Sequence, residues 1–283
     1  MKQLVIFLFI FSLFSGNLFS QGTAETTYSY GLFHGRRIVN GHSLEMQKEG
    51  ELEMYIGHRF GRVNGGAYEF FGLDNAEMRL AFDYGVKDWL AVGLGRNSND
   101  KTYDSFAKVR LLRQSTGKKN MPISLTALSS FAYKTERPAD NRPVPSYARM
   151  AFTHQLLLGR KFSDDLSIQI MPTFTHINLV ETPEDPNDII TLGVAIRYRV
   201  TLNLAITAEY YYNLTPQTEG KYNSLALGFD IDTGSHVFQV HLTNSAGMFE
   251  RAFIAETDSQ WLEGGIHLGF NMNRVFKIKG RRY

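Results

Sequence analysis

Twelve stretches of this sequence alternate apolar and polar residues with a period of two, and no other feature constrains the fold as strongly. The clearest pair lies in 223–244, NSLALGFDIDTGSHVFQVHLTN, where two alternating runs flank an Asp-Thr-Gly-Ser turn. Alternation on both sides of a Gly-containing turn predicts a β-hairpin. No helix-period segment of useful length accompanies these runs, so we expect an all-β fold. The predicted strands are 51–60, 76–86, 89–96, 104–113, 122–133, 148–158, 166–176, 189–198, 202–212, 224–231, 236–244 and 264–273.

One face of the predicted strands is apolar and, away from the strand ends, carries no Asp, Glu, Lys or Arg. On this face lie large apolar side chains such as Leu80, Phe82, Leu227, Phe229 and Val240. A charge on a lipid-facing strand costs about 2–4 kcal/mol at the middle of a bilayer. The purity of this face therefore indicates that it meets lipid.

The opposite face is polar, and its charges are nearly balanced. A narrow closed lumen needs such a balance, because its charges must pair with one another. A soluble sandwich facing bulk water does not. The charged residues on this face are Glu51, Glu53, Arg59, Glu77, Arg79, Asp83, Lys108, Arg110, Arg149, Arg197, Glu209 and Asp230.

The connections between predicted strands alternate between long and short. Short turns at one end and long loops at the other are typical of outer-membrane barrels, and an even strand number places both termini at the short-turn end. Aromatic residues fall near both ends of the strands, as expected at the two membrane interfaces. We therefore expect a closed antiparallel transmembrane β-barrel of about twelve strands. The alternative is a soluble sandwich or a lipocalin-like barrel.

The N-terminus predicts export. A Lys precedes the apolar run 4–14, and small residues follow, so 1–22 is expected to be a signal peptide. The chain has no Cys, which excludes a lipoprotein anchor, disulfides and thiolate metal sites. We expect 23–49 to be a periplasmic N-terminal segment and 50–283 to be the barrel. The net charge of +2 is too small to suggest nucleic acid as a partner.

Several motifs resemble a family of bacterial outer-membrane β-barrel proteins whose function is uncharacterised. They are RIVNGHS (37–43), HRFG (58–61), FFGLD (70–74), GLGRNSNDKTYDSFAKVRLLRQ (93–114), TGSHVFQVHLTNSAGM (233–248) and GFNMNRVF (269–276). The resemblance spans about 37–276. It implies a barrel fold in the outer membrane of a Gram-negative cell, and it implies no catalytic or binding residue.

The candidate binding residues are therefore polar residues assigned to the lumen, where a basic set could attract anions or pair with the carboxylates. Among them, Gln239 and His241 are expected to form a network with Asp230 and His267. The set is Arg110, Arg149, Arg197, Glu209, Asp230, His241 and His267.

Two kinds of chemistry remain as alternatives. In outer-membrane lipid hydrolases a His and a Ser two residues apart act as base and nucleophile, and HLTNSAG (241–247) offers His241 and Thr243. Two His and one carboxylate, here His241, His267 and Asp230, are an acceptable metal set. The hydrolase alternative is weakened because Thr replaces Ser and because His241 is expected to face the lumen. The metal alternative is weakened because the sequence does not fix how the strands that carry its three residues pair.

The sequence thus predicts a non-enzymatic outer-membrane barrel without a cofactor or a bound metal. Its role is either a narrow, porin-like pore or a structural or partner-docking barrel. The expected partners are outer-membrane lipid, the barrel-assembly machinery and a small solute. The alternative is a lipid-modifying hydrolase using His241 and Thr243.

Overall fold

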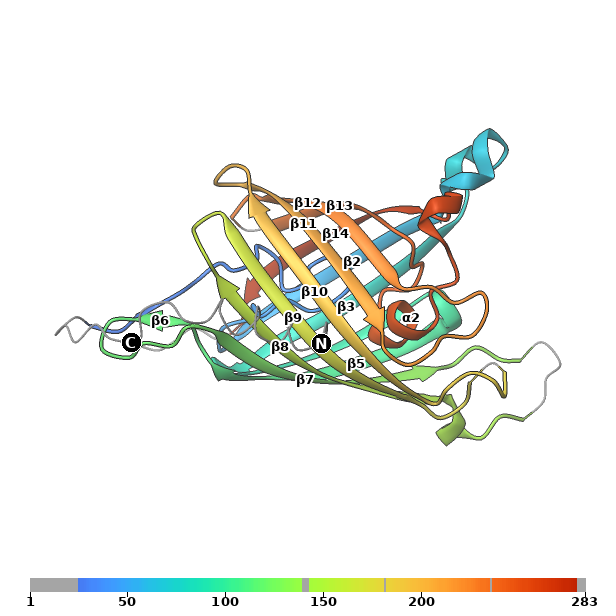
Figure 1. Ribbon diagram of the computed structural model, residues 1–283, viewed down its shortest axis with the longest axis horizontal. Coiled ribbons are helices and arrows are strands. Elements are labelled where there is room, and N and C mark those ends of the chain that lie inside the picture. Colours follow the sequence, from blue (N-terminus) through green and yellow to red (C-terminus); the bar gives the residue numbers. More distant parts are fainter. Residues whose placement is uncertain (1–24, 139–142, 181, 235, 279–283) are drawn as a thin grey trace, which may run out of the picture.

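The computed structural model describes residues 25–138, 143–180, 182–234 and 236–278, in which twelve antiparallel strands form a closed barrel (Figure 1). The barrel strands are β2 (Glu51–Arg62), β3 (Ala76–Lys87), β4 (Leu90–Asn97), β5 (Thr102–Leu112), β7 (Ser124–Lys134), β8 (Met150–Lys161), β9 (Leu166–Ile177), β10 (Asp188–Arg199), β11 (Leu204–Asn213), β12 (Ser224–Asp232), β13 (His236–Thr243) and β14 (His267–Lys277).

Each strand pairs with its neighbours in the chain, and pairing of β14 with β2 closes the barrel. All twelve strands predicted from the alternation are present, and the predicted fold class is confirmed. The expected signal peptide, 1–22, lies outside the described residues.

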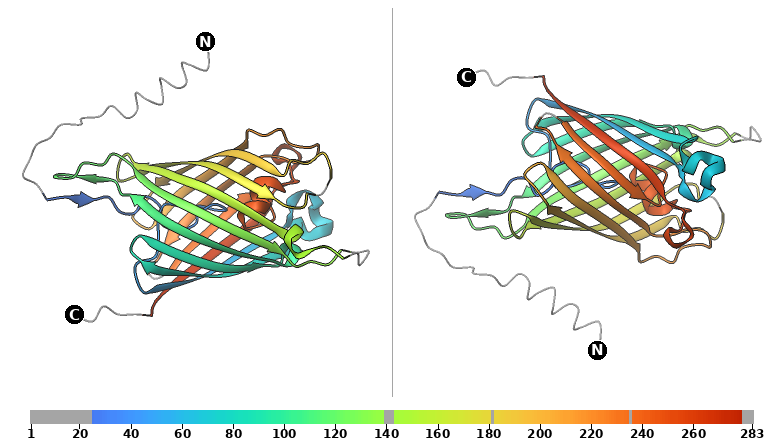
Figure 2. Two further views of the ribbon diagram at one scale, coloured as in Figure 1. Left: turned by 90° about the horizontal axis from the view of Figure 1, so that it is seen from below. Right: turned by 90° about the horizontal axis from the view of Figure 1, so that it is seen from above.

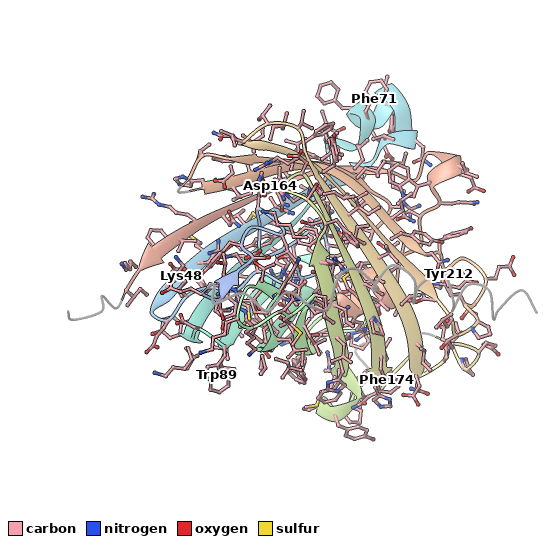
Figure 3. All side chains as sticks on the ribbon, turned by 60° about the vertical axis from the view of Figure 1, so that its left-hand side comes forward. Lys48, Phe71, Trp89, Asp164, Phe174 and Tyr212 are labelled. Atoms are coloured by element: carbon pink, nitrogen blue, oxygen red, sulfur yellow. The ribbon has the colours of Figure 1, made fainter. Side chains whose placement is uncertain are left out.

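The two faces of the wall are those that the alternation predicted. Along β12, for example, Leu227 and Phe229 are exposed on the outer surface, whereas Ala226 and Asp230 are buried inside. Aromatic side chains such as Trp89, Phe174 and Tyr212 stand on the outside of the barrel near its ends (Figure 3). The outer surface is thus the apolar band with aromatic rims that an outer-membrane barrel requires.

The connections differ between the two ends. The short-turn end carries the turns after β3, β8, β10 and β12 and a small sheet of β1 (Thr27–Tyr28) with β6 (Ser115–Thr116). The other end carries the longer loops, which contain η1 (Val63–Gly72), η2 (Asn99–Lys101), η3 (Ser146–Arg149), α2 (Glu250–Ala255) and η4 (Trp261–Glu263). The long-loop end faces the outside in such barrels. No helix in the described part of the chain is long and apolar enough to cross a membrane.

The hydrophobic core lies in the lumen. It joins wall residues to side chains from two segments that fold inward, one before β2 and one that includes α2 (Figure 2). Its members from these two segments are Leu32, Phe33, Ile38, Leu44, Phe249, Ala252, Phe253 and Ile254. The barrel is therefore filled rather than open.

Candidate functional site

Residues 31–48, here called the plug hairpin, enter the lumen from the short-turn end and return to it. We expected this segment to lie in the periplasm, but the structure places it inside the barrel, with Ile38 and Val39 fully buried. Its two arms pair through an antiparallel bridge between Arg37 and His42. Burial of the apolar side chains of RIVNGHS in the lumen removes them from water, and this favours insertion of the segment.

The tip of the plug hairpin is a tight turn at Asn40 and Gly41. The Ile38 amide donates to the Gly41 carbonyl at 2.8 Å, and Asn-Gly is a favoured turn pair. A side chain at Gly41 has no room, because an added Cβ would lie 1.8 Å from the Tyr211 hydroxyl. Glycine is thus required here by the close approach of the wall.

The wall holds the tip through its backbone. The Glu209 carboxylate accepts hydrogen bonds from the backbone amides of Asn40 at 2.5 Å and Gly41 at 3.2 Å. Gln239 donates to the Ile38 carbonyl at 2.5 Å, and Asn271 donates to the Val39 carbonyl at 3.1 Å. Buried backbone groups need such partners, so these wall side chains replace the water that the tip gives up.

Residues 244–263, here called the inner loop, connect β13 to β14 at the long-loop end, and the part that includes α2 folds into the lumen. Its Met248, Phe249, Phe253 and Ile254 are buried. Asn213 on the wall donates to the Ile254 carbonyl at 2.8 Å, which helps to hold α2 against β11. The lumen is therefore occupied from both ends.

The plug hairpin and the inner loop meet at Glu250, the first residue of α2. Its carboxylate lies 3.1 Å from Arg37 Nη1 and 3.4 Å from His42 Nε2 on the plug hairpin. All three side chains are buried. We call this contact of Glu250 with Arg37 and His42 the latch, because it links the two inserted segments directly.

Arg59 on β2 joins the wall to both segments. It donates to the Ser245 and Gly247 carbonyls of the inner loop at 2.8 and 2.9 Å, and to the side chain of Asn40 on the plug hairpin. It also donates to His241 Nε2 at 3.3 Å. One buried guanidinium therefore holds both segments to the wall.

The other charges of the lumen pair locally or hold the plug hairpin. Arg79 and Asp104 form a buried ion pair at 2.5 Å on the wall. Arg36 of the plug hairpin reaches Glu53 on β2 at 3.2 Å. These pairs explain why the charges on the inner face are nearly balanced.

Two of the predicted lumen cations bind the carbonyls of the plug hairpin. Lys108 donates to the Glu45 carbonyl at 2.7 Å. Arg197 donates to the Gly31 and Leu32 carbonyls at 3.1 and 3.3 Å. They stabilise the inserted segment, and no continuous basic ladder forms among the described residues.

Two further predicted lumen cations, Arg110 and Arg149, lie at opposite ends of the barrel. Arg110 lies at the short-turn rim and donates to the Asp88 carbonyl at 2.7 Å. Arg149 lies in η3, before β8 begins, and donates to the Glu136 carbonyl at 2.7 Å at the long-loop end. Alternation assigns a face but not the end of a strand, and both residues lie where the pattern stops.

The expected network of polar residues splits into three parts. Gln239 donates to Asp230 at 2.8 Å, and both lie below the plug tip. His241 is bonded to Arg59, whereas His267 Nδ1 lies 2.8 Å from the Phe60 carbonyl. His241, His267 and Asp230 therefore have separate partners, and the described residues contain no group of three potential metal ligands.

The residues of the hydrolase alternative both face the lumen. His241 and Thr243 are buried. The Thr243 hydroxyl accepts hydrogen bonds from the Ser245 amide at 3.2 Å and from the Asn40 side chain at 3.4 Å. These contacts engage the would-be nucleophile with the two inserted segments and leave it away from the lipid-facing surface.

The residues that matter most here were not among the sequence candidates. Arg59 appeared only as one charge of the inner face, and Arg37, Asn40 and Glu250 were not singled out. One available signal was the Asn-Gly pair in RIVNGHS, which follows the apolar residues Ile38 and Val39. Asn-Gly is a favoured hairpin turn, and it indicates that the segment folds back on itself.

The chain is similar, at low sequence identity, to several solved outer-membrane proteins. No curated protein matches the chain. Among solved structures, the NanC porin is 9% identical, with a TM-score of 0.48 over 81% of this chain and 100% of that one. The KdgM porin is 10% identical, with a TM-score of 0.46 over 80% and 99%. The Acinetobacter baumannii outer-membrane protein Omp33 is 10% identical, with a TM-score of 0.42 over 81% and 99%.

The family comparison covers most of the chain. Residues 33–276 match the model of one family, and they include the plug hairpin from Phe33 onward as well as all twelve strands of the barrel. A membrane-bound barrel whose outer face is an apolar band with aromatic rims belongs in the outer membrane. The chain is thus an outer-membrane protein of the membrane bound beta barrel domain family (DUF5777).

Proposed function

We propose that the protein is a narrow pore for small solutes, held closed at rest by the plug hairpin and the inner loop. The observation that carries this proposal is what fills the lumen. On β8 to β10 many of the buried wall residues are short, and they stand beside longer ones such as Leu157 and Met171; the short ones include Ala151, Thr153, Thr175 and Ala195. A barrel with a purely mechanical role can fill its interior with its own side chains. Short wall side chains around a separate segment leave a channel when that segment moves.

The chemistry of the wall supports the same proposal. The inner surface of the wall carries buried polar groups such as Gln155, Thr191, Thr207 and Asn271. Such groups can bond to water as readily as to the inserted backbone, so the polar part of the wall could line a water-filled channel once the plug hairpin has moved. Water-filled barrels have polar lumens for this reason.

The contacts of His241 and Thr243 do not favour the hydrolase alternative. His241 bonds to Arg59, and Thr243 bonds to Asn40 and Ser245, which belong to the two inserted segments. We therefore propose a non-enzymatic role. We further propose that the outer face contacts outer-membrane lipid and that the barrel-assembly machinery inserts the chain.

The test is the ion conductance of planar bilayers that contain the refolded protein. We expect the intact protein to be almost silent. A variant in which 31–47 is replaced by a short Gly-Ser linker should show stable conductance steps, because both ends of the segment lie at the short-turn end and the wall can close without it. Heat-modifiable mobility on gels checks that the variant folds.

A folded but silent variant would contradict the pore. It would favour the structural or partner-docking role instead, since the lumen would then be closed without the plug hairpin. Steps of equal size and frequency in the intact protein would contradict closure at rest.

A further inference from the structure

The apolar outer face of the barrel is interrupted by polar side chains in the middle of β7 and β8. Ser129 is the central residue of β7, and His154 lies directly opposite it on β8. Both are exposed on the lipid-facing surface. On the opposite wall, β12 and β13 carry large apolar side chains such as Leu227 and Val240 in mid-strand. Polar side chains at membrane depth are rare, and they usually have a protein partner.

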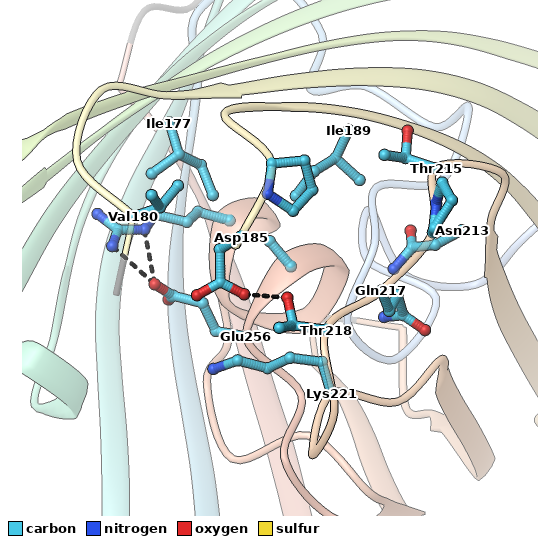
Figure 4. A pocket seen from close by; sticks show the side chains of 14 residues that line it. Ile177, Val180, Asp185, Ile189, Asn213, Thr215, Gln217, Thr218, Lys221 and Glu256 are labelled. Atoms are coloured by element: carbon cyan, nitrogen blue, oxygen red, sulfur yellow. Dashed lines mark hydrogen bonds and ion pairs between the residues drawn. The ribbon is translucent and has the colours of Figure 1, made fainter. Parts of the chain in front are cut away.

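These two polar side chains differ from the other polar groups of the barrel surface, because neither is bonded to another described residue. His58 on β2 also points outward, but its ring stacks on Phe270 at 4.9 Å and meets the edge of Phe60 at 4.5 Å. At the long-loop end, Asp185 accepts the Thr218 hydroxyl from a neighbouring loop (Figure 4). Lipid offers the unbonded pair no replacement for the hydrogen bonds of water, so a partner has to come from outside the barrel.

Short side chains lie around this pair. Ala107, the central residue of β5, lies opposite Ser129 in the β5–β7 ladder. Ser105 and Ala127 are its neighbours on the same outward face of β5 and β7. Protein contacts inside a membrane favour small residues, because these let two backbones approach closely, and polar side chains then bond across the contact. The outer face of β5, β7 and β8 therefore has the composition of a protein contact.

The chemistry of this face indicates which protein it contacts. A hydroxyl both donates and accepts hydrogen bonds, and an uncharged imidazole does both through its two nitrogens. Such groups can bond to their own copies across a twofold axis, where a charged group would meet a like charge. A second copy of this chain therefore complements the face without any other protein.

We propose that the outer face of β5, β7 and β8 is the interface of a homodimer in the membrane, with the twofold axis close to Ser129. The three strands are neighbours in the barrel wall, and β13 lies on the opposite wall (Figure 1). Around such an axis, the Ser129 and His154 side chains of the two protomers bond to one another and leave the lipid. The dimer does not depend on the proposed pore, because neither the plug hairpin nor the inner loop takes part in it.

The test uses the absence of Cys from the chain. Ser129→Cys places a single thiol at the proposed axis, and Val240→Cys, lipid-facing on the opposite wall, is the matched control. Each variant is refolded into phosphatidylcholine vesicles, and heat-modifiable mobility on gels checks folding. With copper phenanthroline as the oxidant, the disulfide-linked dimer should form at least about tenfold faster at position 129 than at 240. Excess lipid should slow the reaction at 240, which needs random collisions, and not at 129.

A second pair of variants tests the polar contact itself. In the Ser129→Cys background, His154→Leu should slow the cross-link by about tenfold, because the hydrogen bonds of both imidazoles are lost. Val240→Leu in the same background changes only the opposite wall and should leave the rate unchanged.

Equal rates at 129 and 240, or a rate at 129 that falls with added lipid as it does at 240, would overturn the interface. A rate unaffected by His154→Leu would overturn the role given to the imidazole. The same thiol can also be oxidised in whole outer membranes. A cross-link to another protein there, with no dimer in vesicles of the purified protein, would overturn the second copy as the partner.

Discussion

At the scale of single residues, Arg59 has more consequences for the plugged state than any of the predicted site residues. It is buried, and it bonds to Asn40 on the plug hairpin and to the Ser245 and Gly247 carbonyls on the inner loop. A planar guanidinium spreads five N–H donors over three nitrogens, so it reaches acceptors that lie farther apart than those within reach of the three donors on the one ammonium nitrogen of Lys. The charge alone would therefore not be enough to hold both segments.

We predict that Arg59→Lys loosens both segments while the barrel still folds. The variant keeps the positive charge but loses hydrogen bonds, each worth about 1.5–3 kcal/mol when a charged group takes part. The protein should unfold at clearly lower urea concentration and show brief conductance bursts that the parent lacks. The matched control is Arg96→Lys, on the exposed face of β4, where Arg96 stacks over Tyr103. A change of equal size in the control would mean that Arg59 has no special role.

At the scale of the strand, the outer face of β12 tests the membrane assignment. Leu227 lies mid-strand and points outward, so Leu227→Arg should cost about 2–4 kcal/mol in a refolding titration into lipid vesicles. Leu262→Arg is the control, because Leu262 is 93% exposed in η4, beyond the ends of the strands. We expect little effect there. Equal costs at both positions would contradict the assignment of the lipid-facing band.

The strands could be predicted because their pattern repeats. Alternation alone identifies which face of a strand is buried, and twelve repetitions identify a barrel. The predicted faces of Leu227 and Asp230 are those in the structure. Strand ends were less predictable, as Arg149 shows, because the last residues of a strand obey no periodic rule.

The plug hairpin and the inner loop could not be predicted in the same way. Their contacts join residues far apart in the chain, such as Arg37 with Glu250 and Asn40 with Glu209. Contacts of this kind leave no periodic pattern in the sequence. The sequence of a loop therefore does not show which distant residues its side chains will meet. The sequence therefore predicted polar lumen residues such as Glu209 and Gln239 but not the backbone groups that they bind.

At the scale of the whole molecule, the lumen is closed by two segments that enter from opposite ends and are linked at Glu250. The plug hairpin returns to the short-turn end, so it can leave without threading through the barrel. The inner loop is joined to β13 at one end and to β14 at the other, and Arg59 and Asn213 hold it to the wall. We expect opening to depend mainly on movement of the plug hairpin.

We predict that a disulfide between the plug tip and the wall prevents opening. An added Cβ at Gly228 would lie 3.1 Å from a Val39 methyl carbon, so a sulfur in place of that methyl would lie within reach of a second thiol at position 228. The chain has no other Cys to interfere. The pair Val39→Cys and Gly228→Cys is placed in the Arg59→Lys background, where bursts are expected. Bilayer recordings should show bursts under reducing conditions and silence after oxidation, whereas Val39→Cys alone in the same background should burst under both. Bursts that persist in the oxidised pair, once mass spectrometry confirms the bond, would show that ions pass without movement of the plug hairpin.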